Sequence, residues 1–319
     1  MRFLVKLLLL LCAASAHAQD PYPNRAIRLV IPYGAGGVSD IMGRVIAQKM
    51  TELLGQPMIV ENRPGAGGML GTAYVAKQSP DGYTVVLSSL SAYAIGPRLV
   101  KQQQYDAVAD FTAIGGVALA PTILTLHPGL PFQSMKELIA YAKANPGKLS
   151  YGSSGIGSVG HISGEVLRVS TGAELVHVPY KTANAAYPDV ISGSVSMVFD
   201  ALPSALQHIR TGKVRPLAMM ADRRSALVPE VPTFTEAGYP EATLRLWTAI
   251  HGPAGVPAPV VQKLNETLNK ALAAADVRER LASVGADPYP TTPRELDQNT
   301  RGDVERLAKM MAAAGIKPE

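Results

Sequence analysis

Short apolar runs alternate with segments of helical periodicity along most of this chain. The first apolar run covers Ile27–Ile31, and from Ile41 to Leu54 apolar residues recur every three to four positions. Further apolar runs of strand length lie at 58–60, 84–88, 122–126, 149–152, 176–179, 195–199, 214–218 and 247–252. This alternation predicts βαβ units, and therefore an α/β fold with largely parallel sheets.

The alternation is interrupted near residue 128, where His127–Pro131 has the composition of a linker, and again near residue 245. Two long helices are predicted beyond residue 259, the second of them from Pro293 to about residue 314. We therefore expect a first domain formed by residues 24–125 and 246–319, and a second domain formed by residues 126–245. Two crossings between the domains would make a hinge.

The stretch Pro32–Asp40 lies between the first predicted strand and the first predicted helix. Its three glycines allow a close approach of the backbone to a ligand, and Ser39 or Asp40 could cap the helix. The free N–H groups of a first helical turn favour an anion. The alternative is a tight turn that binds nothing, because such loops are common in α/β proteins.

A physically similar loop, Ser153–Ser158, follows the run at 149–152 and opens another predicted helix. Two such loops, separated by a predicted linker, indicate that each domain presents one helix N-terminus to a shared site. A further glycine-rich segment, Gly65–Gly71, fits close packing of a helix on a sheet better than a second ligand loop.

The first 18 residues have the pattern of a secretory signal peptide. Arg2 and Lys6 precede the apolar run Leu7–Ala14, and Ala16–Ala18 supplies the small residues of a cleavage site. We therefore expect export to the periplasm with cleavage after Ala18. No later apolar run approaches the ~20 residues needed to cross a bilayer.

The single cysteine, Cys12, lies inside that segment. Leu10 and Leu11 precede it where a lipoprotein signal would have small residues, so a soluble exported protein is favoured over a lipid-anchored one. A mature chain without cysteine excludes disulfides and thiolate catalysis. Removal of Arg2 and Lys6 lowers the formal net charge from +5 to +3. This mild balance argues against nucleic acid as a partner and modestly favours anionic small molecules.

Several enzyme signatures fail. Ser39 occupies the last position of a possible G-x-G-x-x-G motif, there is no G-x-x-x-x-G-K-[ST] loop, and no serine of the second loop fits G-x-S-x-G. His161 and Glu165 stand one helical turn apart without a third metal ligand nearby in sequence. A histidine that bonds backbone or ligand is therefore preferred over a metal site. No cofactor is expected, and binding is favoured over catalysis.

Asp200 directly follows the apolar run at 195–199. An acid at the carboxyl end of a strand lies at the edge where α/β sheets bind ligands, but it could equally cap the helix that follows. Both interpretations stay open.

Ten blocks of sequence carry a resemblance to a known family. They are Tyr22-Pro23, Ile27–Tyr33, Gly36–Asp40, Val60–Gly68, Asp81–Tyr83, Tyr151–Gly155, Gly157-Ser158 with His161, His177–Lys181, Val231–Phe234 and Glu236–Pro240. In order and spacing they resemble the tripartite tricarboxylate transporter substrate-binding proteins, the Bug family of periplasmic receptors. The resemblance covers nearly the whole mature chain.

The resemblance implies a two-domain Venus-flytrap receptor of the periplasmic binding protein class, type II-like, with a mixed, largely parallel sheet in each domain and a two-crossover hinge. It further implies closure on a small carboxylate for a membrane transporter, with the carboxylate held mainly by main-chain amides and water. Carried onto this chain, the resemblance implies a first wall of the site formed by Tyr33, Gly36, Gly37, Ser39 and Asp40. The second wall is formed by Ser153, Ser154, Gly157, Ser158 and His161. Asp200 is a candidate to complete the site.

The chain departs from the family pattern at Gly34-Ala35 and Val38-Ser39, where proline or threonine often stands, and this leaves the preferred ligand open. A ligand that bridges both loops would favour the closed state. A receptor read by a sensor kinase is an alternative function, and a secreted hydrolase is a disfavoured one because no nucleophile or metal is found. A monomer is expected, since hinge closure needs no partner subunit.

Overall fold

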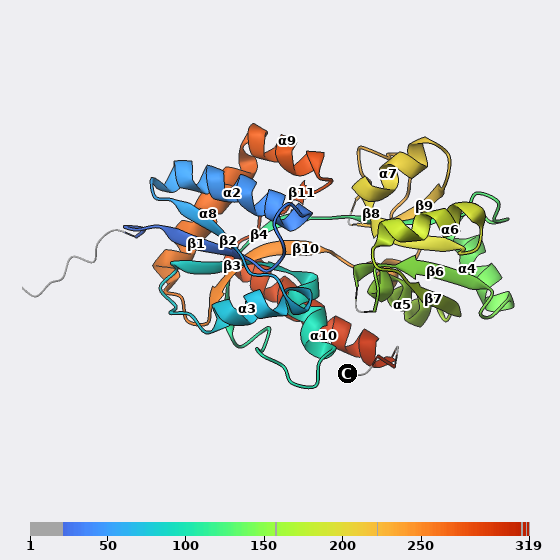
Figure 1. The fold of residues 1–319 in the computed structure, drawn as a ribbon, viewed down its shortest axis with the longest axis horizontal. Helices are drawn as coiled ribbons and strands as arrows, with labels where there is room; N and C mark the ends of the chain where they lie inside the picture. Colours follow the sequence, from blue (N-terminus) through green and yellow to red (C-terminus); the bar gives the residue numbers. More distant parts are fainter. Residues whose placement is uncertain (1–21, 157, 222, 314, 317, 319) are drawn as a thin grey trace, which may run out of the picture.

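A computed structural model describes residues 22–156, 158–221, 223–313, 315–316 and 318. The predicted signal peptide and Gly157 lie outside the described residues. Two α/β domains lie side by side (Figure 1). Within the described part of the chain, no helix combines the length and the apolar character that a membrane span requires.

The first sheet is built around the first apolar run, which forms β1 (Ile27–Ile31). Four of its five residues are buried, as expected for a strand with helices on both faces. It pairs in parallel with β2 (Met58–Asn62) on one side and β3 (Thr84–Ser89) on the other. The antiparallel strands β10 (Trp247–Pro253), β4 (Phe111–Leu119) and β11 (Asp287–Pro288) complete the order β11-β4-β10-β3-β1-β2.

Helices cover both faces of this sheet (Figure 1). One face packs against α2 (Val38–Leu54), α8 (Ala258–Ala273) and α9 (Ala275–Ser283). The other packs against α3 (Met69–Ala76), a π-helical turn at Ser91–Ile95 and α10 (Pro293–Ala313). The apolar side chains on the inner faces of these helices supply the core of the first domain.

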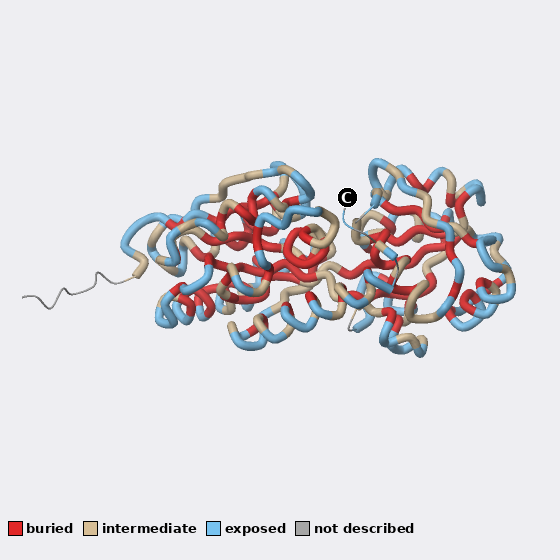
Figure 2. Tube along the Cα trace, turned by 90° about the horizontal axis from the view of Figure 1, so that it is seen from below, coloured by how far each residue is buried: buried red, intermediate tan, exposed pale blue. Residues whose placement is uncertain are grey.

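The second sheet has the order β7-β6-β8-β5-β9. Its strands are β5 (Thr122–Leu126), β6 (Leu149–Ser153), β7 (Leu175–Pro179), β8 (Met197–Ala201) and β9 (Arg215–Met220). Helices α4 (Met135–Ala144) and α5 (Val159–Thr171) pack on one face, and α6 (Tyr187–Ser192) and α7 (Leu202–Arg210) on the other. Figure 2 shows the buried residues concentrated inside each domain.

Both sheets are mixed, as predicted, but they are only partly parallel and not largely so, because β10, β4 and β11 of the first sheet and β5 and β9 of the second pair antiparallel. Between the strands that the structure describes, β1 pairs in parallel with β2 and β3, and β6 with β7 and β8. The hydrophobic pattern did not predict β4, the long strand next to β10, because glycine and alanine interrupt its apolar residues. The glycines are required there, since a Cβ at Gly115 would lie 2.8 Å from Asn265 Nδ2 and one at Gly116 would lie 2.3 Å from Tyr289 O.

The chain crosses between the domains twice. The first crossing is Ala120-Pro121, and the second immediately precedes β10. A hydrogen bond of 2.9 Å from Ala120 N–H to Leu246 O joins the two crossings. The predicted boundary between residues 125 and 126 is wrong, because β5 pairs with β8 and β9 in the second sheet. The linker-like segment His127–Pro131 is a surface loop that follows β5.

Candidate ligand-binding site

A cavity of about 280 Å³ lies between the two domains. The first domain contributes the first turn of α2, the end of β3 and the start of β10. The second domain contributes the loop after β6, the first turn of α5 and the end of β8. The cavity therefore lies at the carboxyl ends of β1, β3, β6 and β8, the edge at which open α/β sheets bind ligands.

The first loop places Ser39 at the cavity and holds Asp40 away from it. Asp40 is 3% exposed, and its Oδ2 accepts hydrogen bonds from Gly36 N–H and Arg44 Nε, each at 2.9 Å. Its Oδ1 accepts a third from Asn62 Nδ2. The hydrogen bond from Arg44, supported by those from Gly36 and Asn62, lowers the pKa of Asp40 to about 2. The Asp40 carboxylate thus fixes the shape of the loop.

Gly37 is the N-cap of α2 and provides no side-chain cap. The N–H groups of the first turn of a helix have no partner within the helix, so this end of α2 presents donors where Val38 and Ser39 border the cavity. A Cβ at Gly36 would meet no atom within 4 Å, but its φ of +82° favours glycine. Gly36 and Gly37 are both exposed.

Tyr33 lies behind this wall. Its hydroxyl shares a hydrogen bond of 2.6 Å with Ser89 Oγ, and Ser89 borders the cavity. Burial raises the pKa of the Tyr33 phenol, which is therefore neutral. Tyr33 ties the end of β1 to the end of β3 and so positions Ser89.

The second loop has the same organisation. Ser154 is exposed and borders the cavity, whereas Ser153 is fully buried at the end of β6. Ser153 Oγ accepts a hydrogen bond from Gly155 N–H at 3.1 Å and shares one of 2.7 Å with His177 Nε2. Ser158 is the N-cap of α5, and its hydroxyl accepts the N–H of His161 at 3.3 Å.

His161 is 8% exposed and stacks on His177 with ring centroids 4.2 Å apart. Burial lowers the pKa of both imidazoles, that of His177 to about 4, so both are neutral at pH 7. Glu165 accepts hydrogen bonds from Tyr151 Oη and Arg168 Nε, each at 2.9 Å. Among the described residues, no group of three or more His, Cys, Asp or Glu is arranged to hold a metal ion.

Asp200 is the penultimate residue of β8 and borders the cavity. Its Oδ1 accepts the N–H of Ala201 at 2.8 Å, while its buried Oδ2 has no hydrogen-bond partner. Burial raises the pKa of this carboxyl. The capping interpretation is wrong, because Ala201 is the N-cap of α7 and no side chain caps that helix.

The sequence did not single out several residues that border the cavity. They are Met42, Ser89, Leu90, Ser91, Thr122, Phe199, Leu246, Trp247 and Thr248. A signal did exist for Ser89, since polar residues at the carboxyl end of a buried strand face the ligand edge. The apolar residues have no comparable signal, because their pattern is that of ordinary core.

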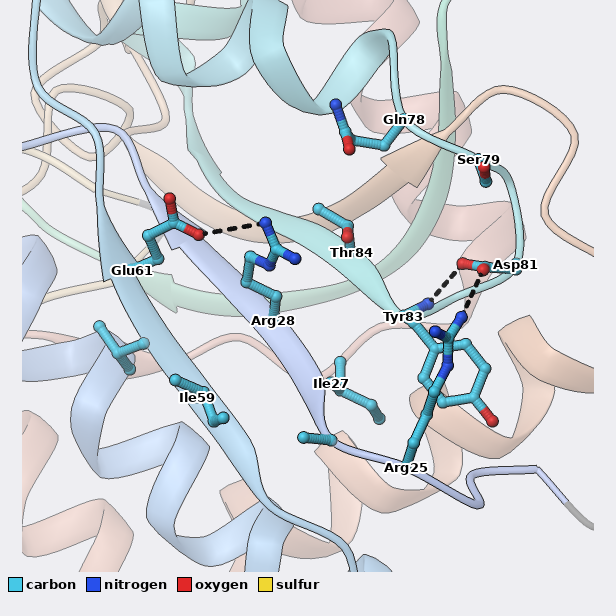
Figure 3. A pocket seen from close by; sticks show the side chains of 12 residues that line it. Arg25, Ile27, Arg28, Ile59, Glu61, Gln78, Ser79, Asp81, Tyr83 and Thr84 are labelled. Atoms are coloured by element: carbon cyan, nitrogen blue, oxygen red, sulfur yellow. Dashed lines mark hydrogen bonds and ion pairs between the residues drawn. The ribbon is translucent and has the colours of Figure 1, made fainter.

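A second hollow, of about 380 Å³, lies on the first domain near the amino ends of β1 and β3, whereas the cavity between the domains lies at their carboxyl ends. Figure 3 shows the side chains that line this hollow. The charged side chains that line this hollow pair with one another. Arg25 forms an ion pair with Asp81 at 2.9 Å, and Arg28 lies 3.5 Å from Glu61. With its arginines already paired, this hollow is a poorer candidate for an anionic ligand than the cavity between the domains.

Comparisons with known proteins converge on one family. Residues 42–316 match the family described as tripartite tricarboxylate transporter family receptor. Protein BugT of Bordetella pertussis is 36% identical over 305 residues, which cover 95% of this chain and 94% of BugT.

In two of the similar solved structures a carboxylic acid is bound. An R. palustris protein with adipate has a TM-score of 0.75 at 33% identity, over 93% of this chain and 100% of the other. MatC from Rhodopseudomonas palustris with bound malate has a TM-score of 0.71 at 31% identity, over 91% and 99%.

Proposed function

The chain belongs to the tripartite tricarboxylate transporter receptor family, and on that premise we propose that it is a periplasmic receptor for a small carboxylate-containing ligand. Its two domains close on the ligand, which it then delivers to a tripartite tricarboxylate-type membrane transporter. Two relatives that were solved with adipate and malate support a carboxylic acid as the ligand.

The observation that carries this proposal is the convergence of two helix N-termini on one cavity. Val38 and Ser39 of α2 border it from the first domain, and Val159 and Gly160 of α5 from the second. The first-turn N–H groups and the helix dipoles of both helices favour a negative charge between them. A carboxylate can be bound there without an arginine or lysine.

Closure follows from the same arrangement. In the open state a ligand can contact only one helix end fully, whereas in the closed state it contacts both. The ligand therefore binds the closed state more tightly and shifts the population toward it.

Thermal unfolding of the purified mature protein against a panel of small acids tests the proposal. An acid present at 100 times its Kd is expected to raise the free energy of unfolding by ~2.7 kcal/mol. Neutral sugars of similar size serve as the control panel. A stabilisation by sugars and by none of the acids would overturn the carboxylate assignment.

Delivery is tested separately, with the acid that binds most tightly. Uptake of that acid by cells that carry the transporter's membrane subunits is expected to require this receptor. Equal uptake with and without the receptor would contradict the transport role while leaving the binding role intact.

A further inference from the structure

The wall of the cavity between the two helix ends is mainly apolar. Its large side chains are Met42, Leu90, Val159, Phe199, Leu246 and Trp247. Met42, Leu90, Phe199 and Trp247 are each at most 2% exposed to solvent, so their positions are fixed by packing before a ligand arrives. A ligand that fills the cavity must place part of its own surface against this wall, including the more exposed side chains Val38, Val159 and Leu246.

Trp247 offers the cavity no hydrogen-bond donor. Its indole Nε1–H donates to Asp303 Oδ2 at 2.9 Å, on α10. The donor is therefore engaged with Asp303 and is not free for a ligand, although Trp247 borders the cavity. At 1% exposure, Trp247 is part of the packed wall and contributes little open surface of its own.

Positive charge is missing from the same wall. Among the described residues that border the cavity there is no arginine, lysine or histidine, and the one ionisable side chain is the Asp200 carboxyl. The helix ends can bind one carboxylate. A second carboxylate on the ligand would face apolar side chains or Asp200, and an unpaired charge in such a site is costly.

We propose that this receptor selects small monocarboxylic acids with an apolar aliphatic or aromatic body over di- and tricarboxylic acids. This inference rests on the proposed function and specifies its ligand class. The cavity volume of about 280 Å³ lies just below the usual range of about 300–1,000 Å³ for ligand pockets, which restricts the apolar body of the ligand to a short chain or a single ring.

Pairs of matched acids test the effect of a second carboxylate on binding. Hexanoate and adipate have the same six-carbon chain and differ only in the second carboxylate. Binding is measured by calorimetry and by the emission of Trp247, which is the only tryptophan of the chain and borders the cavity. Hexanoate is expected to bind at least tenfold more tightly than adipate, and benzoate more tightly than terephthalate.

A comparison of butanoate, pentanoate and hexanoate measures how much contact with the apolar wall contributes to affinity. Each added methylene is expected to tighten Kd about fourfold, the amount given by burial of one CH₂ group. A flat series, or adipate binding as tightly as hexanoate, would overturn the proposed ligand class while the receptor still binds acids. Failure of every acid would instead overturn the proposed function itself.

A substitution in the first turn of α2 tests whether an added positive charge allows a second carboxylate to bind. Val38 is 50% exposed and borders the cavity, so Val38→Arg introduces a cation there without disturbing the core. The variant is expected to improve the binding of adipate relative to hexanoate at least tenfold. Leu53→Arg is the matched control, because Leu53 lies on the same helix, is 45% exposed and does not border the cavity. It is expected to leave the ratio unchanged, and an equal change in both variants would contradict the proposal.

Discussion

At the scale of single residues, the polar groups of the two loops divide into those that border the cavity and those that hold the loops in shape. Asp40 and Ser153 are buried and bonded within their own loops, whereas Ser39 and Ser154 border the open space. A loop that presents backbone N–H groups needs both kinds of residue. The internal bonds fix the donors in position before binding, which lowers the cost of ordering them.

Asp200 leads to a prediction about pH. Burial raises the pKa of its carboxyl, so the ionised form is less favourable in the folded protein than in the unfolded chain. The free energy of unfolding therefore falls as the pH rises from about 4, the pKa of an aspartate in the unfolded chain, through the raised pKa of the folded protein. Below pH 4 the carboxyl is protonated in both states and this loss is absent. Asp200→Asn keeps an oxygen that can accept the N–H of Ala201.

In the ligand-free protein, Asp200→Asn is expected to raise the free energy of unfolding at pH 8, because the amide carries no charge to bury. At pH 3 the variant should show no gain. Urea unfolding at the two pH values measures the difference. A variant that is less stable than the wild type at pH 8 would show that the ionised carboxylate is compensated in the folded protein.

The sequence could indicate which loops to examine, but it could not assign every role inside them. Serine, aspartate and glycine are the residue types needed both to contact an anion and to cap or brace a turn. Asp40 and Ser39 are adjacent in sequence, and only the folded loop shows which of them borders the cavity. Trp247 and Phe199 were missed for a different reason, because apolar residues at strand ends have the pattern of core.

At the scale of elements, the site depends on how closely α5 approaches β8. Gly160, in the first turn of α5, borders the cavity and packs on the strand. A Cβ at this position would lie 2.7 Å from Phe199 O, which is backbone and cannot rotate away. The helix end can therefore reach the cavity only because residue 160 has no side chain.

Gly160→Ala is expected to lower the free energy of unfolding by about 1–3 kcal/mol, the usual cost of overpacking. Gly302→Ala is the matched control, since Gly302 lies inside α10 and a Cβ there would meet nothing within 4 Å. That variant should gain about 0.5–1 kcal/mol from helix propensity. Chemical denaturation measures both, and a stabilised Gly160→Ala would show that α5 can shift outward at no cost.

Hydrophobic periodicity was sufficient to locate most strands and helices, and it failed where packing required small residues. The apolar run at 122–126 coincides with β5, but its sheet was assigned incorrectly because the linker-like prolines follow this strand and the true crossing precedes it. Pairing partners are set by contacts between residues far apart in the chain, and local composition does not contain them.

At the scale of the whole molecule, α10 belongs to the first domain and supports the second. It packs against β4 and also against α5, and the core shared by these elements includes Leu307, Met311 and Ile162. Asp303 of α10 accepts the indole N–H of Trp247, and Arg306 donates to Thr243 O at 2.7 Å. The helix thereby fastens the second crossing to both domains.

Asp303→Ala is expected to lower the free energy of unfolding by about 1–3 kcal/mol, because it leaves the buried indole N–H of Trp247 without its acceptor. Asp297→Ala is the control on the same helix. Asp297 forms an exposed ion pair with Arg301, so its loss should cost less than about 1 kcal/mol. Urea unfolding followed by Trp247 emission measures both variants, and equal losses would argue against a special role for the Trp247 contact.

The order of strands in the first sheet has a consequence for the sequence of events during synthesis. β10 lies between β3 and β4, and the Ser88 hydroxyl of β3 bonds the Ala249 carbonyl 161 residues later in the chain. Whether the chain emerges from a ribosome or from a secretion channel, all strands of the second sheet are therefore delivered before the first sheet can close around β10. The second domain is continuous in sequence and can pair its strands early, while the first must keep an open edge, and contacts of such long range fold slowly. Helix α10 is the last helix to be delivered, and it packs against both domains.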